Sequence, residues 1–440
     1  MMMRTALLLG LLVWSASTAA LDVDAEIEYE ARSYYELEGG VADSSVAGKL
    51  ELFHRWDRRK QRLIAELFHR EDRQDPSRTH SDVREAYYHH IGREAELRLG
   101  LRRVYWGVTE SRHLVDIINQ SDFVEDLDNE AKLGQPMFNP AFITDWGTLD
   151  LFLLPYARAR TFPGKNGYPR LPFEVAVGEA QYESARGQKR LDFAARWAMV
   201  LGGADIGLSF FSGSAREPQL LPCLRRGSGF DGTEDGPNCV PESAIPDPGP
   251  LPPAVIDLLQ QLGLAPTEEE VEQQILDAIV LVPHYELIDQ AGLDAQYVWG
   301  ATAWKLEVSL RRQGGRWHTA AVAGFEHTLG DLFGSGIDLG LLAEYLYDER
   351  GSLLGSRFDD DWFGGMRIGF NDIAGTQILA GGIVEPDGSN RLFSIEASRR
   401  LGNSWRVALE GRVFSDIPDD DPLAFFADQD HLRLEFVRYF

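Results

Sequence analysis

The sequence has no long uninterrupted run of apolar residues. Nowhere in its 440 residues does an apolar stretch approach the roughly 18 residues that a membrane-spanning helix needs. The only compact apolar segment, residues 6–13, follows Arg4 and precedes the small residues 17–20, an arrangement typical of an export signal. We expect residues 1–20 to be a signal peptide and residues 21–440 to be the mature chain. A membrane protein of this sequence would have to be a β-barrel.

Basic residues are also scarce. Lysine and arginine together number 43 against 69 acidic residues, which gives a formal net charge of -26. A nucleic-acid-binding surface needs a basic patch, so the composition indicates no nucleic-acid partner. The acidic residues gather in expected loops, for example 359–361 and 419–421. They are either solvated loop tips or groups that attract cations to a pore mouth.

Only two cysteines are present, Cys223 and Cys239. The segment between them is rich in glycine, proline and aspartate, which is typical of a surface loop. In an exported chain this spacing predicts one disulfide, which would stabilise the loop by about 3 kcal/mol in the chain-entropy model. Two free thiols are the alternative.

The sequence lacks the common catalytic signatures. It contains no nucleophile elbow, no His-Glu-x-x-His pair and no glycine-rich phosphate loop. Histidines such as His89 and His90 fall at the end of an expected strand, where a polar residue at an interface is the simpler interpretation. The acidic run 125–130 lacks the glycine and the alternating ligands of a calcium loop. We therefore predict neither an enzyme nor a cofactor, and no metal site.

What the sequence does contain is alternation of apolar and polar residues. In the last ten residues, Leu432, Leu434, Phe436 and Phe440 share one parity, whereas Arg433 and Glu435 take the other. A strand with one face in lipid and one face in water requires this pattern. Arg438 departs from it, and its long side chain would reach the headgroups from the membrane edge.

The same alternation recurs along the chain, with turn signals roughly every ten to fifteen residues. A partner strand for 149–153 is expected between residues 172 and 182, where the pattern is poorly defined. The expected strands are 21–35, 45–56, 62–70, 80–91, 95–106, 149–153, 193–201, 206–210, 285–298, 304–311, 319–329, 338–348, 362–370, 376–385, 393–400, 405–413 and 431–440. They predict an all-β fold, a transmembrane antiparallel β-barrel of 16–18 strands, in which an even number returns both termini to one side.

Aromatic residues and loop lengths follow the same logic. Aromatic girdles are expected at both ends of the strands, built from Trp56, Tyr105, Trp304, Trp362, Trp405 and Tyr439. Short links such as 202–205 and 402–404 alternate with long ones such as 416–430 and 213–284, and we place the long ones outside the cell. The link 213–284 carries both cysteines, a proline-rich stretch and two helical patterns, 251–264 and 267–279. These helices would pack over the mouth, enter the lumen or lie against the barrel rim.

The parity opposite the apolar one is rich in both charges. A barrel this wide cannot be filled by side chains, so these residues are predicted to line a pore and to set which solutes pass. Alternatively, they pair across neighbouring strands, each pair contributing roughly 0.2–1 kcal/mol. The candidates are Glu96, Arg98, Arg102, Arg196, Lys305, Glu307, Arg311, Glu344, Glu396, Arg400, Arg406, Glu410, Arg412, Arg433 and Glu435.

Residues 107–146 show no strand alternation, although many of them are apolar. A long loop of this composition has to bury its apolar side chains, and the inside of the barrel is the available place. We therefore predict that it is a constriction loop. Its candidate residues are Trp106, Glu110, Asp116, Asn119 and Asp122.

Two parts of the sequence resemble a known group. Residues 98–122, with Gly100, Arg102, Trp106 and the run 116–122, resemble the porin-like outer-membrane barrels of Gram-negative bacteria, which are similar in style to alginate-export channels. The C-terminal half is similar to the same group in three places, 324–326, 339–348 and 399–402. The resemblance implies an envelope channel or exporter with the Trp106 region near the pore.

Together these patterns predict a single-domain channel or exporter in the outer membrane of a Gram-negative bacterium. It would contact outer-membrane lipid and let polar or anionic solutes or polymers pass through a charged lumen. The alternative is a non-conducting barrel whose loops dock components of an envelope transport complex.

Overall fold

The computed structural model describes residues 21–37, 40–224, 238–239, 279–350, 358, 360–386, 391–418 and 422–440. The expected signal peptide and both helical patterns up to residue 278 lie outside these residues. Ile279, which the second helical pattern included, is the first residue of a strand. No helix in the described ranges is long and apolar enough to cross a membrane.

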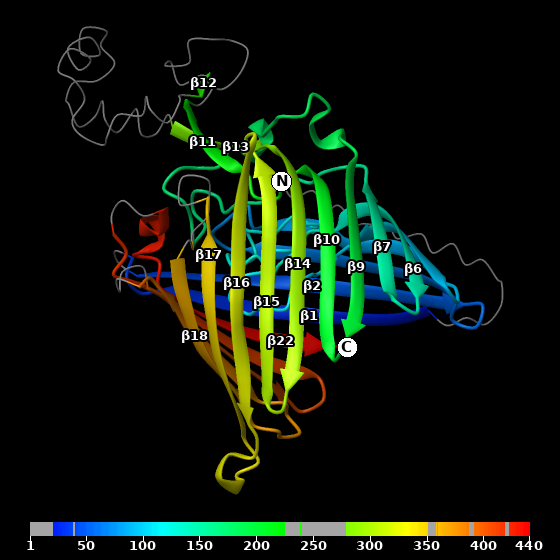
Figure 1. Cartoon of the computed structure of the whole chain (residues 1–440). Coiled ribbons are helices and arrows are strands. Elements are labelled where there is room, and N and C mark those ends of the chain that lie inside the picture. The colour runs from blue at the N-terminus through cyan, green and yellow to red at the C-terminus, as the bar shows by residue number, and fades with distance from the viewer. Residues whose placement is uncertain are drawn as a thin grey trace.

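Eighteen antiparallel strands form one closed sheet (Figure 1). The first strand pairs with the second and also with the last, with Glu26 opposite Tyr439 and Tyr34 opposite His431. The strands are β1 Leu21–Tyr34, β2 Val41–Trp56, β3 Gln61–Asp72, β4 His80–Ile91, β5 Ala95–Arg102, β6 Gln135–Thr144, β7 Gly147–Leu154, β9 Asp192–Leu201, β10 Ala204–Ser214, β14 Leu287–Trp299, β15 Thr302–Gln313, β16 Arg316–Leu329, β17 Asp338–Asp348, β18 Asp360–Gly369, β19 Gln377–Val384, β20 Arg391–Leu401, β21 Trp405–Ser415 and β22 His431–Tyr439. The predicted all-β antiparallel barrel is therefore confirmed, with a strand number at the upper end of the expected range.

Side-chain alternation explains why these segments close into a barrel. Along β5, Leu99 is half exposed on the outside, while Arg98 and Arg102 bond to Asn139 on the inner face of β6. The pattern holds in β22, where Leu432 and Phe436 are exposed outside and Arg433 pairs with inner carboxylates. The ring shape lets every strand bond on both edges, which removes the free sheet edge that an open sheet would expose.

The sequence patterns missed one strand, extended another too far and gave a third the wrong partner. Residues 107–146 contain β6, whose alternation is unclear. Its outward positions hold two prolines, Pro136 and Pro140, besides Phe138 and Phe142. β5 ends at Arg102 rather than at residue 106. The partner of β7 is β9, and not a strand between residues 172 and 182.

A small second sheet lies at one end of the barrel. It contains β12 Asn238–Cys239, β11 Gln219–Leu224, β13 Ile279–Tyr285 and β8 Gln181–Tyr182, in that order. The predicted loop 213–284 thus begins and ends in strands. The backbones of Cys223 and Cys239 lie opposite each other in this sheet, and the disulfide between them stays a prediction.

The two ends of the barrel differ. Short turns such as 202–203 and 402–404 lie at the end where β1 begins, which we call the short-turn end. The chain also ends there, because the Phe440 amide donates to the carbonyl oxygen of Ala25 at 2.9 Å. The small sheet and the long connections lie at the opposite, long-loop end (Figure 1). Exposed tryptophans occur at both ends, with Trp299 and Trp405 at the first and Trp317 and Trp362 at the second. Tyr105, expected in a girdle, instead follows β5 into the interior.

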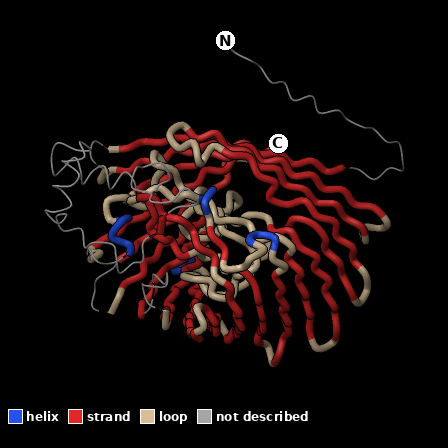
Figure 2. Tube along the Cα trace, turned by 90° about the horizontal axis from the view of Figure 1, so that it is seen from above, coloured by secondary structure: helices blue, strands red, loops and turns tan. Residues whose placement is uncertain are grey.

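Viewed along the barrel, several connections lie inside the ring of strands (Figure 2). Two of these connections are long. Residues 103–134 connect β5 to β6, and residues 155–191 connect β7 to β9. We call them the inner segment and the second inner segment.

Candidate pore and constriction site

The inner segment crosses the barrel from one wall to the other. It bonds to Glu307 in β15 and Glu344 in β17, and also to Arg84 in β4 and Arg412 in β21. These strands lie far apart around the ring. A single segment can reach all of them only from within the ring of strands. Residues 103–134 therefore lie within the ring of strands, and their role as a constriction stays a prediction.

Glu307 is the main anchor on one wall. Its Oε1 accepts hydrogen bonds from the Val108 amide at 2.7 Å and from the Thr109 hydroxyl at 2.7 Å, and its Oε2 accepts from the Leu114 amide at 2.7 Å. The side chain of Glu307 is fully buried. A buried carboxylate is tolerated because amides and a hydroxyl saturate its oxygens, and these charge-assisted bonds fix the turn that they surround.

Glu344 and Asp348 in β17 hold the neighbouring residues. Glu344 accepts from the amides of Glu110 and Ser111, both at 2.8 Å, and from the Ser111 hydroxyl at 2.6 Å. Asp348 pairs with Arg112 at 3.1 Å. The turn at residues 108–115 is therefore bound to two strands through both backbone and side chains.

Asn119 closes the base of the inner segment. Its Oδ1 accepts from the Val104 amide at 2.8 Å, and its Nδ2 donates to the carbonyl oxygens of Arg102 and Leu133 at 2.9 and 2.8 Å. One buried side chain thus joins the start of the segment to its end. This predicted constriction residue holds the loop together and does not face the lumen.

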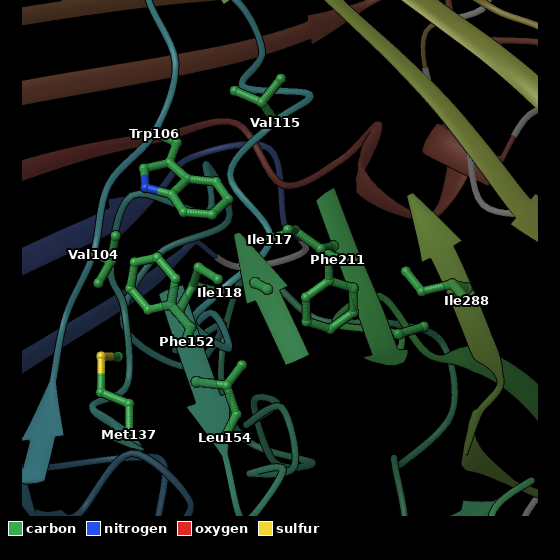
Figure 3. Packing of buried hydrophobic residues seen from close by; sticks show 12 residues of the cluster. Val104, Trp106, Val115, Ile117, Ile118, Met137, Phe152, Leu154, Phe211 and Ile288 are labelled. Atoms are coloured by element: carbon green, nitrogen blue, oxygen red, sulfur yellow. The ribbon is translucent and has the colours of Figure 1, made fainter. Parts of the chain in front are cut away.

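Apolar side chains of the inner segment pack against the inner faces of β6, β7, β10 and β14 (Figure 3). Trp106 meets Phe152 edge to face with the ring centroids 5.6 Å apart, and the Arg196 guanidinium lies 5.3 Å from the Trp106 ring. Val115 and Ile118 are fully buried in the same cluster. On the other side, Leu114 packs into a second cluster formed by β16 to β19. These apolar side chains of the inner segment are thus buried against the barrel wall.

The opposite wall holds the segment through ion pairs. Asp126 lies 2.6 Å from Arg433 and 2.8 Å from Arg412, and Asp128 lies 3.0 Å from Arg412. Burial alone would raise the pKa of Asp126, but Arg412 and Arg433 hold it well below its usual range. Burial and the negative charge of Asp126 raise the pKa of Asp128 to about 7.

A third contact region faces β3 and β4. Asp122, fully buried, pairs with Arg84 at 2.5 Å and accepts from Thr161 Oγ1 at 2.5 Å, and Glu125 pairs with Arg70 at 2.9 Å. His80, Asp122 and Glu125 offer ligand atoms within 4.8 Å of one another. Their carboxylates already have arginine partners, so arginine provides the charge compensation here.

His113 and Asp116 of the inner segment make further ionic contacts. His113 bridges Glu130 at 3.3 Å and Glu307 at 3.5 Å. Burial would lower the pKa of His113, but these two carboxylates raise it to about 10. Asp116 pairs with Lys132 at 3.1 Å, and burial raises the pKa of Asp116.

Most of the predicted pore-lining residues have charged or polar partners on the same strand or on a nearby strand. Arg98 bonds to Glu96 and lies 3.4 Å from Asp150, whereas Arg102 donates to Asn139 at 3.0 Å. The other pairs are Arg196–Asp294 at 2.5 Å, Lys305–Glu326 at 3.3 Å, Arg311–Gln290 at 2.8 Å, Arg412–Glu410 at 2.8 Å, Arg433–Glu410 at 2.5 Å and Arg433–Glu435 at 3.1 Å. The pairs that join different strands tie the wall together, and the role of all these residues along a water path stays a prediction.

Three predicted residues differ from the rest. Arg400 lies near the short-turn end and donates to the carbonyl oxygens of Ile373 and Ala374. Glu396 is exposed and Arg406 is partly buried. The hydrogen bonds of Arg400 go to the turn residues Ile373 and Ala374 and not to the inner segment.

The lumen retains water contact on the short-turn side of the inner segment. Glu110 in the inner segment pairs with Arg367 at 2.8 Å, and the Arg367 side chain is 40% exposed. Across the barrel, Lys49 bridges Glu26 and Glu51, all of them partly exposed. Partly exposed charged side chains of both signs therefore lie in the barrel interior, and we call Glu26, Lys49, Glu51, Glu110 and Arg367 the vestibule residues.

Sequence patterns missed several residues that hold the interior. Alternation in β1 and β3 could have indicated Glu30, Arg32 and Arg70, which form one buried ionic network with Arg78. The second inner segment gave no pattern at all, yet its Tyr168 carbonyl accepts from the Tyr34 hydroxyl at 2.6 Å. Residues in irregular connections carry no periodic signal, so only the folded structure reveals these partners.

Comparison with known proteins gives only distant similarities. No family matches the chain, and neither does any curated protein. Among solved structures, the chain is similar to Pseudomonas aeruginosa OccD3, with 9% identity over 96% of this chain and 91% of that one and a TM-score of 0.49. It is also similar to a triple-mutant porin of Rhodopseudomonas blastica, with 8% identity over 96% of this chain and 100% of that one and a TM-score of 0.40. Both likenesses are too distant to say what this chain carries or binds.

Proposed function

We propose that this chain is a passive channel in the outer membrane of a Gram-negative bacterium, and that the inner segment is its constriction. The outer surface supports a membrane position. Outward residues such as Ile27, Leu99, Leu208 and Leu310 are 40–50% exposed, which is costly in water and favourable in lipid. Exposed tryptophans at both ends would sit at the two membrane interfaces.

The observation that carries the proposal is the anchoring of the inner segment across the lumen. Glu307 and Glu344 fix it to one wall by backbone hydrogen bonds, and Asp126 fixes it to the other by ion pairs. A segment held at both sides narrows the lumen without depending on a ligand. Passage through it requires no catalytic group and no cofactor.

The solute would be polar or charged. Both charge signs occur among the vestibule residues, for instance Glu51 and Lys49 in one ion-pair group and Arg367 in another. Charges at a narrow water path select solutes by sign and size. Passage of an anionic polymer, in the style of alginate-export channels, is one form of this proposal, and outer-membrane lipid would surround the barrel.

A non-conducting barrel is the second candidate, and one observation favours it. Toward the long-loop end the interior is packed with apolar clusters, including Phe123, Phe162, Phe414 and Phe426. Such packing would suit a plugged barrel whose loops dock parts of an envelope transport complex.

Planar-bilayer recording separates the two. The purified mature chain, refolded in detergent, should produce discrete current steps in potassium chloride, and a salt gradient should give a reversal potential that reports cation or anion preference. A folded, inserted protein that gives no current at any voltage would reject the channel and leave the docking barrel. Heat-modifiable migration on gels and a strand-rich circular dichroism spectrum would establish that the barrel is folded.

A further inference from the structure

The turn between β2 and β3 exposes a group of basic side chains at the short-turn end. Arg58, Arg59 and Lys60 are all exposed, and Asp57 is the acidic residue beside them. In the described part of the chain, none of these three basic groups forms an ion pair. The turn therefore presents three positive charges beside one negative charge, in a chain whose formal net charge is -26.

The backbone of this turn is strained. Asp57, Arg58 and Arg59 have φ angles of 49°, 52° and 70°, in the left-handed region that disfavours residues with a Cβ atom. The turns at Gly202 and Gly402, at the same end of the barrel, meet similar angles with glycine. Because glycine would form the β2–β3 turn at a lower cost, the side chains kept there point to a role outside the fold.

A second turn adds to this basic surface. The Ile91 amide donates to the carbonyl oxygen of Lys60 at 2.8 Å, which places the β4–β5 turn, residues 92–94, beside the β2–β3 turn. It exposes Arg93 and Glu94, so that the two turns together expose four basic side chains and two carboxylates. Other turns at the short-turn end expose acidic residues, namely Asp145, Asp331 and Asp372. Among the described turns at this end, positive charge is therefore concentrated beside strands β2 to β5.

Aromatic rings lie on the outer face of the barrel next to this turn. Trp56, the last residue of β2, stacks on His54 with the ring centroids 5.4 Å apart and lies 6.2 Å from the ring of Tyr88. Leu63 pairs with both His54 and Tyr88 across the strands and is 49% exposed, which places these side chains on the outer face. Toward the short-turn end, the outer face thus passes from apolar residues such as Leu67 to aromatic and then to basic residues.

This order matches the layers of a phospholipid leaflet. Acyl chains lie deepest, tryptophan and tyrosine favour the level of the headgroups, and basic residues attract anionic lipid at the surface. A guanidinium group also fits two phosphate oxygens with two parallel N–H donors, a geometry that an ammonium group lacks. Arg58 and Arg59, side by side in the turn, therefore suit the phosphodiester of a lipid headgroup.

We propose that the β2–β3 turn binds the phosphodiester of an anionic phospholipid in the inner leaflet of the outer membrane. The inference rests on the proposed membrane position, in which the long loops face outward from the cell and the short-turn end faces the periplasm, and it adds a lipid site outside the lumen. A zwitterionic headgroup binds less well, because its own ammonium group competes with Arg58, Arg59 and Lys60 for the phosphate. The bound lipid holds this edge of the barrel at a fixed depth in the leaflet.

Native mass spectrometry of the detergent-solubilised mature chain, titrated with phosphatidylglycerol or phosphatidylcholine, tests the proposal without requiring conductance. Arg58→Gln with Arg59→Gln should weaken phosphatidylglycerol binding about tenfold, the equivalent of ~1.4 kcal/mol, and leave phosphatidylcholine binding unchanged. Arg58→Gly with Arg59→Gly should lose as much affinity, and its turn stays folded because glycine accepts the left-handed backbone.

The matched control is Arg399→Gln with Arg400→Gln, which removes the same charge at the same end of the barrel. These arginines already have acceptors, since Arg399 pairs with Asp372 at 3.8 Å and Arg400 donates to the carbonyl oxygen of Ile373 at 3.0 Å. The control should bind phosphatidylglycerol as wild type does. Glycerol phosphate, which carries the phosphate without the acyl chains, should not displace the lipid at equal concentration.

Equal phosphatidylglycerol affinities in the turn variants and in the control, with all proteins heat-modifiable on gels, would overturn the proposal. So would displacement of the lipid by glycerol phosphate, which would show a site for soluble phosphate instead. A conducting protein without the lipid preference would refute only the lipid site. A protein that binds phosphatidylglycerol through this turn but carries no current would refute only the channel.

Discussion

Glu307 and Thr109 lie 198 positions apart in the sequence, yet one carboxylate oxygen of Glu307 accepts both the amide of Thr109, at 3.1 Å, and its hydroxyl, at 2.7 Å. Through these two hydrogen bonds, strand β15 of the barrel wall holds the turn at Thr109 in place.

Replacing Glu307 with glutamine should loosen the inner segment. An amide has one acceptor oxygen where the carboxylate has two, so buried amides such as that of Leu114 would lose their partner at ~1–3 kcal/mol each. We expect faster proteolysis within residues 103–134 and noisier single-channel currents. Glu349→Gln, which makes the same change at an exposed glutamate outside the inner segment, is the control. Identical cleavage rates in both variants would contradict the anchoring role.

Replacing Asp126 with asparagine should shift ion preference toward anions. The change removes the negative charge between Arg412 and Arg433, and loss of one partner of a buried ion pair also destabilises the fold by roughly 3–5 kcal/mol. Reversal potentials in a salt gradient measure the first effect and thermal unfolding the second. The exposed Asp145 offers a matched control, and an equal effect of Asp145→Asn would argue against a special role for Asp126.

Selectivity should also change with pH because of Asp128. Its pKa of about 7 lies above the ordinary value of 3.8, so the carboxyl group gains a proton as the pH falls through 7 and the cluster becomes more positive. The folded protein binds this proton at a higher pH than the unfolded chain does. The contribution of Asp128 to the free energy of unfolding therefore falls as the pH rises from about 4 to about 7. Reversal potentials at pH 8 and 5.5 should differ in wild type, and the difference should shrink in Asp128→Asn.

His113 should make stability fall at alkaline pH. Its pKa in the folded protein is about 10, above the ordinary 6.5, so its stabilising charge is fully present below about pH 6.5 and is lost as the pH rises to 10. The melting temperature of wild type should therefore drop between pH 7 and 10 by more than that of His113→Gln. If the melting temperatures of the two proteins fell equally with pH, His113 would have no such stabilising role.

Cys223 and Cys239 should resist thiol labelling until they are reduced. Their backbones lie opposite each other in β11 and β12, and an exported protein matures in an oxidising compartment. A maleimide-polymer gel shift with and without reductant checks this. Two labels on the unreduced protein would show free thiols instead.

Sequence periodicity was sufficient where a strand separates two environments. Leu432 and Arg433 take opposite faces because one side of β22 faces outward and the other faces charged partners, so local alternation revealed the strand. It failed in β6, where Pro136 and Pro140 replace the usual outward residues. It also could not pair Asp128 with Arg412, 284 positions away, because such contacts depend on how the inner segment folds back across the barrel.

Single-channel conductance of a deletion variant tests most directly whether the inner segment narrows an open lumen. Removal of residues 116–132 should raise the unit conductance well above that of wild type, because the ion-paired part of the segment would be gone. Removal of residues 332–335, in a turn where Phe333 is almost fully exposed, should leave conductance unchanged. An unchanged conductance in the first variant, with the barrel still folded, would show that the inner segment does not narrow the lumen.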